Sequence, residues 1–153
     1  MSHDRMLIER NHTRLSIILA RIRDFCELND WPSVNFETSQ FCSLLYFEIG
    51  QEEDVLFPAY QAKTRINDDI VDHLMQQHTE LREVLDDLII AMTREKKVEF
   101  EAQFALLNGL IADHNDKEEE LLLAMMGHFE PEELERLGQR MREYVVTSAG
   151  KKH

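Results

Sequence analysis

The sequence predicts an all-α fold, an up-down-up-down four-helix bundle with a short additional C-terminal helix. Hydrophobic residues recur at spacings of three and four over long stretches, which is the pattern of a helix with one buried face. Only five glycines and three prolines occur among the 153 residues, so few positions interrupt these helices. This length suits one domain with a sizeable core and is short for two. We therefore expect a single domain over residues 1–153, with its core bundle at about 4–126.

The first two helices are expected at about residues 4–28 and 35–62. In the first helix, His12 lies on a row of apolar residues, which are Ile8, Leu15, Leu19, Ile22 and Cys26. The segment 29–33 is rich in residues that favour turns and should separate the two helices. In the second helix, Glu48 and Glu52 share a face with the apolar residues Phe41, Leu45, Val55 and Ala59. Pro58 lies inside this pattern, so we expect a kink or an early end near Phe57.

A polar turn at residues 63–67 precedes the third helix, whose N-cap is expected to be Asp68 or Asp69. On this helix His78 lies on an apolar row made of Val71, Leu74, Leu81, Leu85 and Leu88. A fourth helix is expected from about residue 98 to about residue 126, with His114 and Glu118 one turn apart on its apolar face. A proline at position 131 suits the first turn of a last helix, at about 131–145.

The charge of the chain argues against two classes of partner. Thirty acidic residues against 17 basic ones give a formal net charge of −13, so we expect no nucleic acid and no membrane as partner. The N-terminus has no apolar signal core, and no stretch approaches the roughly 20 apolar residues of a membrane span. The two cysteines, Cys26 and Cys42, are too few for a disulfide scaffold and are expected to be free thiols. These features favour a cytoplasmic protein.

The two halves of the chain resemble each other at an offset of 66 residues. The aligned positions are His12-Thr13-Arg14-Leu15 with His78-Thr79-Glu80-Leu81, Glu48 with His114, Glu52 with Glu118, Glu53 with Glu119, and Leu56 with Leu122. In both halves, 36 residues separate the first histidine from the next polar residue of the apolar face. This match predicts a duplicated helical hairpin.

The spacing also predicts that the polar residues of the apolar faces lie at one height of the bundle. In an antiparallel hairpin, two residues lie level when they are equidistant from the turn. The midpoint of His12 and Glu48 is residue 30, and the midpoint of Glu52 and His78 is residue 65. The midpoint of His78 and His114 is residue 96, and all three midpoints fall in predicted turns. One layer should therefore contain His12, Glu48, Glu52, His78, His114 and Glu118.

Three histidines and three glutamates directed inward at one level are what a pair of metal ions requires. Nitrogen and oxygen ligands without thiolate suit iron or manganese, with zinc possible. A single histidine on an apolar row, such as His12, is more often a hydrogen-bonded core residue. For the whole layer, however, three carboxylates without cations would repel one another and be pushed toward protonation. The other acidic residues of the runs Glu52-Glu53-Asp54 and Glu118-Glu119-Glu120 are expected to face solvent.

These residues resemble the hemerythrin-like family, the HHE cation-binding domains, over about residues 4–126. The family pattern His-x-x-x-Glu-Glu-x-x-Leu-Phe-Pro matches residues 48–58 except at its histidine, where this chain has Glu48. The resemblance implies a non-haem di-iron centre with carboxylate and oxo or hydroxo bridges. By this resemblance Glu52 and Glu118 are the bridging carboxylates. His12 and Glu48 would ligate one iron, and His78 and His114 the other.

Two departures from the family pattern bear on function. Glu48 replaces a histidine, and Leu74 stands where classical hemerythrins add a second histidine on the third helix. His73 lies about 140° from His78 around the helix, so we do not expect it to reach the metal. The site would be richer in oxygen ligands and less saturated than that of an oxygen carrier, and hard carboxylates favour ferric iron. The sequence leaves open whether Glu48 coordinates the metal.

These features predict sensing, scavenging or activation of O2, NO or peroxide, or a role in iron handling or oxidative stress, rather than reversible oxygen transport. A redox activity of the iron pair is left open. The alternative is a regulatory bundle that has lost the dinuclear centre and binds a protein partner through an acidic face. A ferritin-like relation is less favoured, because that group uses Glu-x-x-His spacing. No nucleophile–base motif, phosphate-binding glycine loop or CxxC motif supports a hydrolase or kinase.

Overall fold

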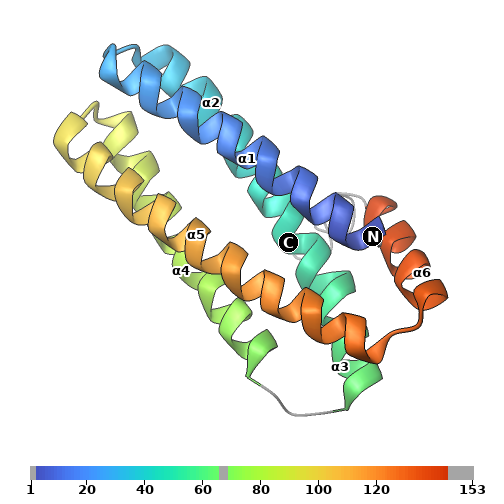
Figure 1. The fold of residues 1–153 in the computed structure, drawn as a ribbon. Helices are drawn as coiled ribbons and strands as arrows, with labels where there is room; N and C mark the ends of the chain where they lie inside the picture. Colours follow the sequence, from blue (N-terminus) through green and yellow to red (C-terminus); the bar gives the residue numbers. More distant parts are fainter. Residues whose placement is uncertain (1–2, 66–68, 145–153) are drawn as a thin grey trace.

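The computed structural model describes residues 3–65 and 69–144, and these residues form helices and no strand. The elements are α1 (His3–Glu27), α2 (Trp31–Gln51), the π-helical turn η1 (Glu52–Leu56), α3 (Phe57–Thr64), α4 (Ile70–Thr93), α5 (Lys97–His128) and α6 (Pro131–Arg142). Figure 1 shows two antiparallel hairpins, α1 with α2 and α4 with α5, lying along each other, with α6 across one end. The predicted fold class, an all-α bundle with a short additional C-terminal helix, is confirmed.

The α1–α2 turn is shorter than the sequence pattern predicts, because α2 begins at Trp31 rather than near residue 35. Asn29 has a φ of 55°, a left-handed conformation that ends α1. The carboxylate of Asp30 then caps α2 by accepting hydrogen bonds from the backbone N–H of Ser33 at 3.2 Å and from its hydroxyl at 2.7 Å. Pro32 is tolerated in the first helical turn, where its missing N–H is not needed. The predicted helix break at residues 31–33 was therefore wrong.

The expected disturbance near Pro58 takes the form of the π-helical turn η1, directly before the proline. The N–H of Phe57 bonds to the carbonyl of Glu52, five residues back, where an α-helix would use a residue four back. Pro58 has no N–H to bond to the carbonyl of residue 54, so the wider turn replaces a bond that the α-helix could not make. The helix continues as α3 and changes its angular register by about one residue.

The remaining helix ends agree with the predictions to within three residues. Asp69 is the N-cap residue of α4, without a hydrogen bond from its side chain, and Asp68 lies outside the described residues. Helix α6 begins with a capping box in which Glu130 and Glu133 bond to each other's backbone N–H groups. Its described end is Arg142, and the predicted end at residue 145 lies outside the described residues.

The apolar core consists of two clusters, one on each side of the predicted polar layer. One cluster fills the end with the α1–α2 and α4–α5 turns and includes Leu15, Leu45, Leu81 and Ile111. The other fills the end covered by α6 and includes Ile8, Val55, Leu74 and Leu121. On α1, α4 and α5 the polar residues of the layer lie in sequence between residues of the two clusters. The arrangement is that of a bundle interrupted by one buried polar cross-section.

Helix α6 covers the bundle end by apolar packing, and Tyr144, which follows the helix, adds further contacts. Its buried residues are Leu134, Leu137, Gly138 and Met141. Beyond the helix, the Tyr144 ring packs against Phe47 with centroids 5.5 Å apart, and its hydroxyl donates a 2.8 Å hydrogen bond to Asp54. The ring lies directly over Gly50, where a Cβ atom would collide with the Tyr144 hydroxyl. A glycine inside α2 is thus explained by the close approach of Tyr144.

Both cysteines are free, with Cys26 buried and Cys42 half-buried, as expected. Within the ranges 3–65 and 69–144, no helix is long and apolar enough to cross a membrane.

The contact between Gly50 and Tyr144 predicts that the effect of Gly50→Ala on stability depends on the Tyr144 ring, which a double-mutant cycle measures. Alanine is favoured over glycine in a helix interior by about 1 kcal/mol. In a Tyr144→Ala background, Gly50→Ala should therefore stabilise the protein by roughly that amount. In the wild-type background the new methyl group displaces the ring, so the gain should vanish or become a loss, with a coupling of about 1 kcal/mol or more. Urea denaturation of the four proteins measures this, and additive effects would contradict the contact.

Candidate metal centre

The six predicted residues come together in one layer, in two groups of three. One group is Glu52, His78 and His114, and all three are buried. The other is His12, Glu48 and Glu118, of which His12 is half-buried. In each group, one nitrogen or oxygen atom per residue lies within 4.8 Å of the corresponding atoms of the other two. The sequence prediction that these side chains share one cross-section agrees with this geometry.

Each group contains one carboxylate from the opposite hairpin. Glu52 continues the α1–α2 hairpin, but it lies with His78 of α4 and His114 of α5. Glu118 belongs to α5, but it lies with His12 of α1 and Glu48 of α2. Glu52 and Glu118 are the positions that the repeat aligns with each other. The Glu118 carboxylate contacts both groups, since Oε1 lies 3.0 Å from Nε2 of His12 and Oε2 lies 3.3 Å from Nε2 of His114.

The inner ring nitrogen of each histidine faces carboxylate oxygens. Nε2 of His12 lies 3.0 Å from Oε1 of Glu118 and 3.5 Å from Oε1 of Glu48. Nε2 of His78 lies 2.8 Å from Oε1 of Glu52. Nε2 of His114 lies 3.3 Å from the same Glu52 oxygen and 3.3 Å from Oε2 of Glu118. The rings of His78 and His114 are 5.0 Å apart between centroids, so the two imidazoles are neighbours.

The outer ring nitrogens of two histidines have partners that fix the rings. Nδ1 of His78 lies 2.7 Å from Oε2 of Glu53, a carboxylate that also accepts from Arg82 at 3.3 Å. Nδ1 of His114 lies 3.0 Å from Oε1 of the buried Gln77. A metal-bound histidine commonly donates its other N–H to a carboxylate or carbonyl, which sets the ring orientation. Glu53 and Gln77 therefore act as the orienting partners of these two histidines.

Glu53 was expected to face solvent, and this expectation was wrong. Adjacent residues of an α-helix point about 100° apart, which is why Glu52 alone was assigned to the core. In the structure both residues lie in the π-helical turn, and both carboxylates contact the ring of His78, one at each nitrogen. Phe57, which follows this turn, stacks on the same ring at 5.7 Å between centroids. Pro58 was the sequence signal for the turn, but it does not reveal how the neighbouring side chains are redirected.

The histidines have raised pKa values because carboxylates surround them. Burial lowers the pKa of His12, but the carboxylates of Glu118 and Glu48 outweigh burial and raise it to about 10. Burial likewise lowers the pKa of His78 and of His114, while neighbouring carboxylates, chiefly Glu52, raise both above the usual value. With a pKa of about 10, the His12 imidazole is protonated at neutral pH.

The three carboxylates differ in how they are compensated. Burial raises the pKa of Glu48 to about 8 and also raises that of Glu118, where the charge of Glu52 adds to the effect. Burial acts in the same direction on Glu52, but the adjacent Glu118 carboxyl and the His114 ring hold its pKa well below the usual range. Burial therefore favours the protonated form of Glu48 and Glu118, whereas the neighbours of Glu52 stabilise its ionised form.

The remaining hydrogen-bonding capacity of these carboxylates suits metal ions. Among the described residues, Oε2 of Glu48, of Glu52 and of Glu118 is buried and accepts no hydrogen bond, although that of Glu118 lies 3.3 Å from Nε2 of His114. A buried carboxylate oxygen without a hydrogen bond is costly, so each is an available ligand atom. Three imidazoles and three carboxylates without thiolate form a donor set for iron, manganese or zinc. On both grounds, the residues present fit a pair of divalent or trivalent ions.

Comparison with protein families agrees with this geometry. The family model described as the hemerythrin HHE cation-binding domain matches residues 5–126, which is most of the chain. This chain belongs to the hemerythrin HHE family. Searches of curated proteins and of solved structures gave no match. The hemerythrin domain is thus a cation-binding domain, and the matched range includes all six residues of the layer.

His73 lies away from the six residues of the polar layer. It is exposed on α4 and lines a surface pocket with Asp113 and Asp116 of α5. Leu74, at the position where classical hemerythrins have a second histidine, is fully buried in the apolar cluster near α6. Neither residue contributes to the two groups of possible ligands.

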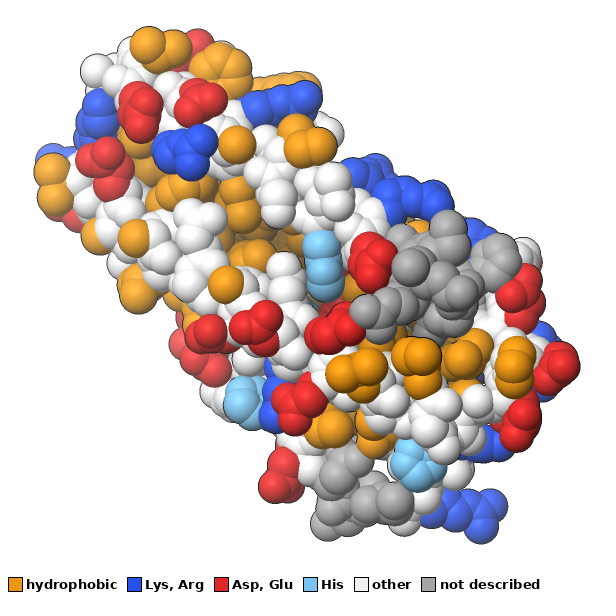
Figure 2. Space-filling model, in the orientation of Figure 1, with side chains coloured by type: hydrophobic (Ala, Val, Ile, Leu, Met, Phe, Trp, Pro, Cys, Tyr) orange, Lys and Arg blue, Asp and Glu red, His pale blue; other side chains and the backbone are white. Residues whose placement is uncertain are grey.

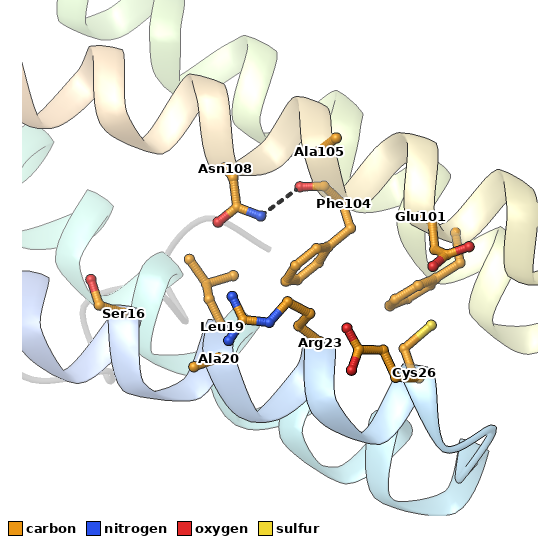
Figure 3. Close-up of a pocket in the computed structure, with 11 residues that line it drawn as sticks. Ser16, Leu19, Ala20, Arg23, Cys26, Glu101, Phe104, Ala105 and Asn108 are labelled. Atoms are coloured by element: carbon orange, nitrogen blue, oxygen red, sulfur yellow. Dashed lines mark hydrogen bonds between the residues drawn. The ribbon is translucent and has the colours of Figure 1, made fainter.

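A groove of about 460 Å³ lies between α1 and α5, and none of the six residues of the layer lines it. Its walls include Leu19, Phe100 and Phe104, and Figure 2 shows hydrophobic side chains at the bottom of the hollow between these helices. In Figure 3 the side chains of Leu19, Arg23 and Phe104 project into the space between them. The groove reaches Ser16, which is one helical turn from His12. His12 is also the most exposed of the six, with 21% of its side chain accessible.

The raised pKa values predict that metal binding releases protons. His12 (pKa about 10) and Glu48 (pKa about 8) are protonated at pH 7 and must lose their protons before they can coordinate a cation. The affinity should therefore rise with pH between 6 and 8, by about tenfold per pH unit for each proton released. Calorimetric titration with Mn²⁺ in buffers of different ionisation enthalpy measures the number of protons. Uptake without proton release, or affinity that falls with pH, would contradict the protonation pattern.

Proposed function

We propose that this hemerythrin domain binds two iron ions as a non-haem centre bridged by carboxylate and by oxo or hydroxo ligands. The observation that supports the proposal most strongly is the pair of ligand groups with exchanged carboxylates. His12 and Glu48 would hold one ion, and His78 and His114 the other. Glu52 and Glu118 would bridge the two ions, since each lies with the histidines of the opposite hairpin.

The choice of iron rests on the donor set. Imidazole and carboxylate ligands without thiolate suit iron, and they also suit manganese or zinc, so the metal is part of the proposal. Glu48 in place of a histidine, and Leu74 in place of another, leave fewer nitrogen ligands than an oxygen carrier has. Hard oxygen ligands stabilise the ferric state, which opposes the easy oxidation and reduction that reversible oxygen transport needs.

We therefore propose that the domain senses, scavenges or activates O2, NO or peroxide, in iron handling or in an oxidative-stress response. Bound iron would supply redox chemistry and an open coordination position for a small ligand. The protein supplies the ligands, the orienting partners Glu53 and Gln77, and an apolar surrounding that limits the access of water. The groove that reaches Ser16 offers a small ligand an approach on the side of His12.

The alternative is a regulatory bundle that binds a protein partner and no metal, and Glu48 is the feature that favours it. This alternative has to account for Glu52, which is 1% exposed and has an oxygen that accepts no hydrogen bond from the described residues. Replacement of buried ion pairs by apolar residues is often neutral or stabilising, so stability alone gives little reason to retain such a layer.

Metal analysis distinguishes the two functions. After aerobic expression in iron-rich medium and purification without chelator, the protein should contain about two iron ions per chain and show near-ultraviolet absorption of an oxo-bridged ferric pair. His78→Ala and Glu118→Gln should each remove at least half of the iron, because each deletes a ligand. His73→Ala is the matched control on α4 and should retain all of it. Less than one iron per chain in the wild type, with variants unchanged, would favour the regulatory bundle.

A further inference from the structure

We infer that Gln51 is a positioning residue that couples the metal centre to α6, so that metal binding and docking of α6 strengthen each other. The inference rests on the proposed function, because it concerns how the same metal site is connected to the rest of the chain. Helix α6 lies outside residues 5–126, so this connection is an addition to the matched family domain.

The amide of Gln51 joins two ligand-bearing helices to α6. Gln51 directly precedes Glu52 and is 1% exposed. Its Nε2 donates a 2.8 Å hydrogen bond to the backbone carbonyl of Met141, near the end of α6. Its Oε1 accepts a hydrogen bond, at 3.4 Å, from Nδ2 of Asn11, which is also buried and directly precedes His12. Gln51 precedes one proposed ligand, Glu52, and Asn11 precedes another, His12. The buried amide of Gln51 therefore links both segments to α6.

The bond from Gln51 to Met141 depends on α6 being docked. A buried amide without partners is costly, and the N–H of Gln51 finds its acceptor on α6. The contact is supported by Tyr144, which lies over Gly50 and donates to Asp54 on either side of Glu52. Undocking of α6 would remove the Gln51–Met141 bond and the contacts of Tyr144 from the segment that carries Glu48 and Glu52.

The coupling has to act in both directions. Metal ions that fix Glu52 and His12 also fix the neighbouring Gln51 and Asn11, and so favour the position in which Gln51 bonds to Met141. Conversely, docked α6 orders Gln51 before the metal arrives, which lowers the entropic cost of binding. Such linkage is reciprocal by thermodynamic necessity.

The start of α6 offers a matched control. Nζ of Lys63 forms an ion pair with Glu133 at 2.8 Å, and both side chains are partly exposed. Lys63→Met removes this contact between α3 and α6 without touching a residue next to a proposed ligand. Gln51→Met keeps the approximate size of the side chain and removes both of its hydrogen bonds.

The experiment is hydrogen–deuterium exchange of the α6 amides in the full-length protein, with and without Mn²⁺ and with metal content measured in parallel. In the wild type, metal should slow exchange in α6 by roughly three- to tenfold, the effect of about one hydrogen bond. Lys63→Met should keep this slowing. Gln51→Met should lose it, and its Mn²⁺ affinity should fall by a similar factor.

Several outcomes would overturn the coupling. Bound Mn²⁺ with unchanged exchange in wild-type α6, or a slowing that persists in Gln51→Met, excludes it while leaving the metal site intact. Should Gln51→Met fail to fold, Gln51→Asn keeps a buried amide but shortens it, so that it no longer reaches the Met141 carbonyl, and an unchanged slowing in that variant also excludes the coupling. A wild-type protein that takes up no metal overturns the proposed function together with the coupling, and the metal content identifies that case.

Discussion

The electrostatic cost of three carboxylates in one buried cross-section is the constraint on which the rest of this structure depends. Glu52 and Glu118 are almost completely removed from solvent, and an apolar bundle offers such groups nothing by itself. The chain supplies three histidines, whose raised pKa values measure how strongly the carboxylates attract positive charge. Two metal cations would provide more positive charge at the same place. The hairpins are held together at this level because Glu52 and Glu118 each face at least one histidine from the other hairpin.

The layer itself could be predicted from the sequence because it follows from helix periodicity and hairpin symmetry. Residues spaced by three or four share a face, and residues equidistant from a turn share a height. These two rules predict that His12, Glu52 and His114 lie together. The same periodicity identified the apolar rows on either side. That these residues bind metal remains a prediction that the metal analysis tests.

What the sequence did not reveal depends on contacts and local geometry without a periodic signal. Glu53 contacts His78 because a π-helical turn replaces an α-helical one, and regular spacing cannot indicate this. The start of α2 depends on the side chain of Asp30, whose capping bonds outweigh the turn preference of the residues around it. The contact between Gly50 and Tyr144 joins positions 94 residues apart, which no local pattern predicts.

The division of the apolar core has a consequence for how the bundle unfolds. Leu15 and Leu81 belong to one cluster and Ile8 and Leu74 to the other, so burial energy is stored in two separate regions. In a fully apolar bundle, packing contacts are continuous along the axis. Here the two apolar clusters are separated by the polar layer, so contacts between the two ends run through ionisable groups. The strength of the polar cross-section therefore sets whether the two ends melt as one cooperative unit or as two. The residues proposed to bind metal would therefore also determine whether the two ends of the bundle unfold in a single transition.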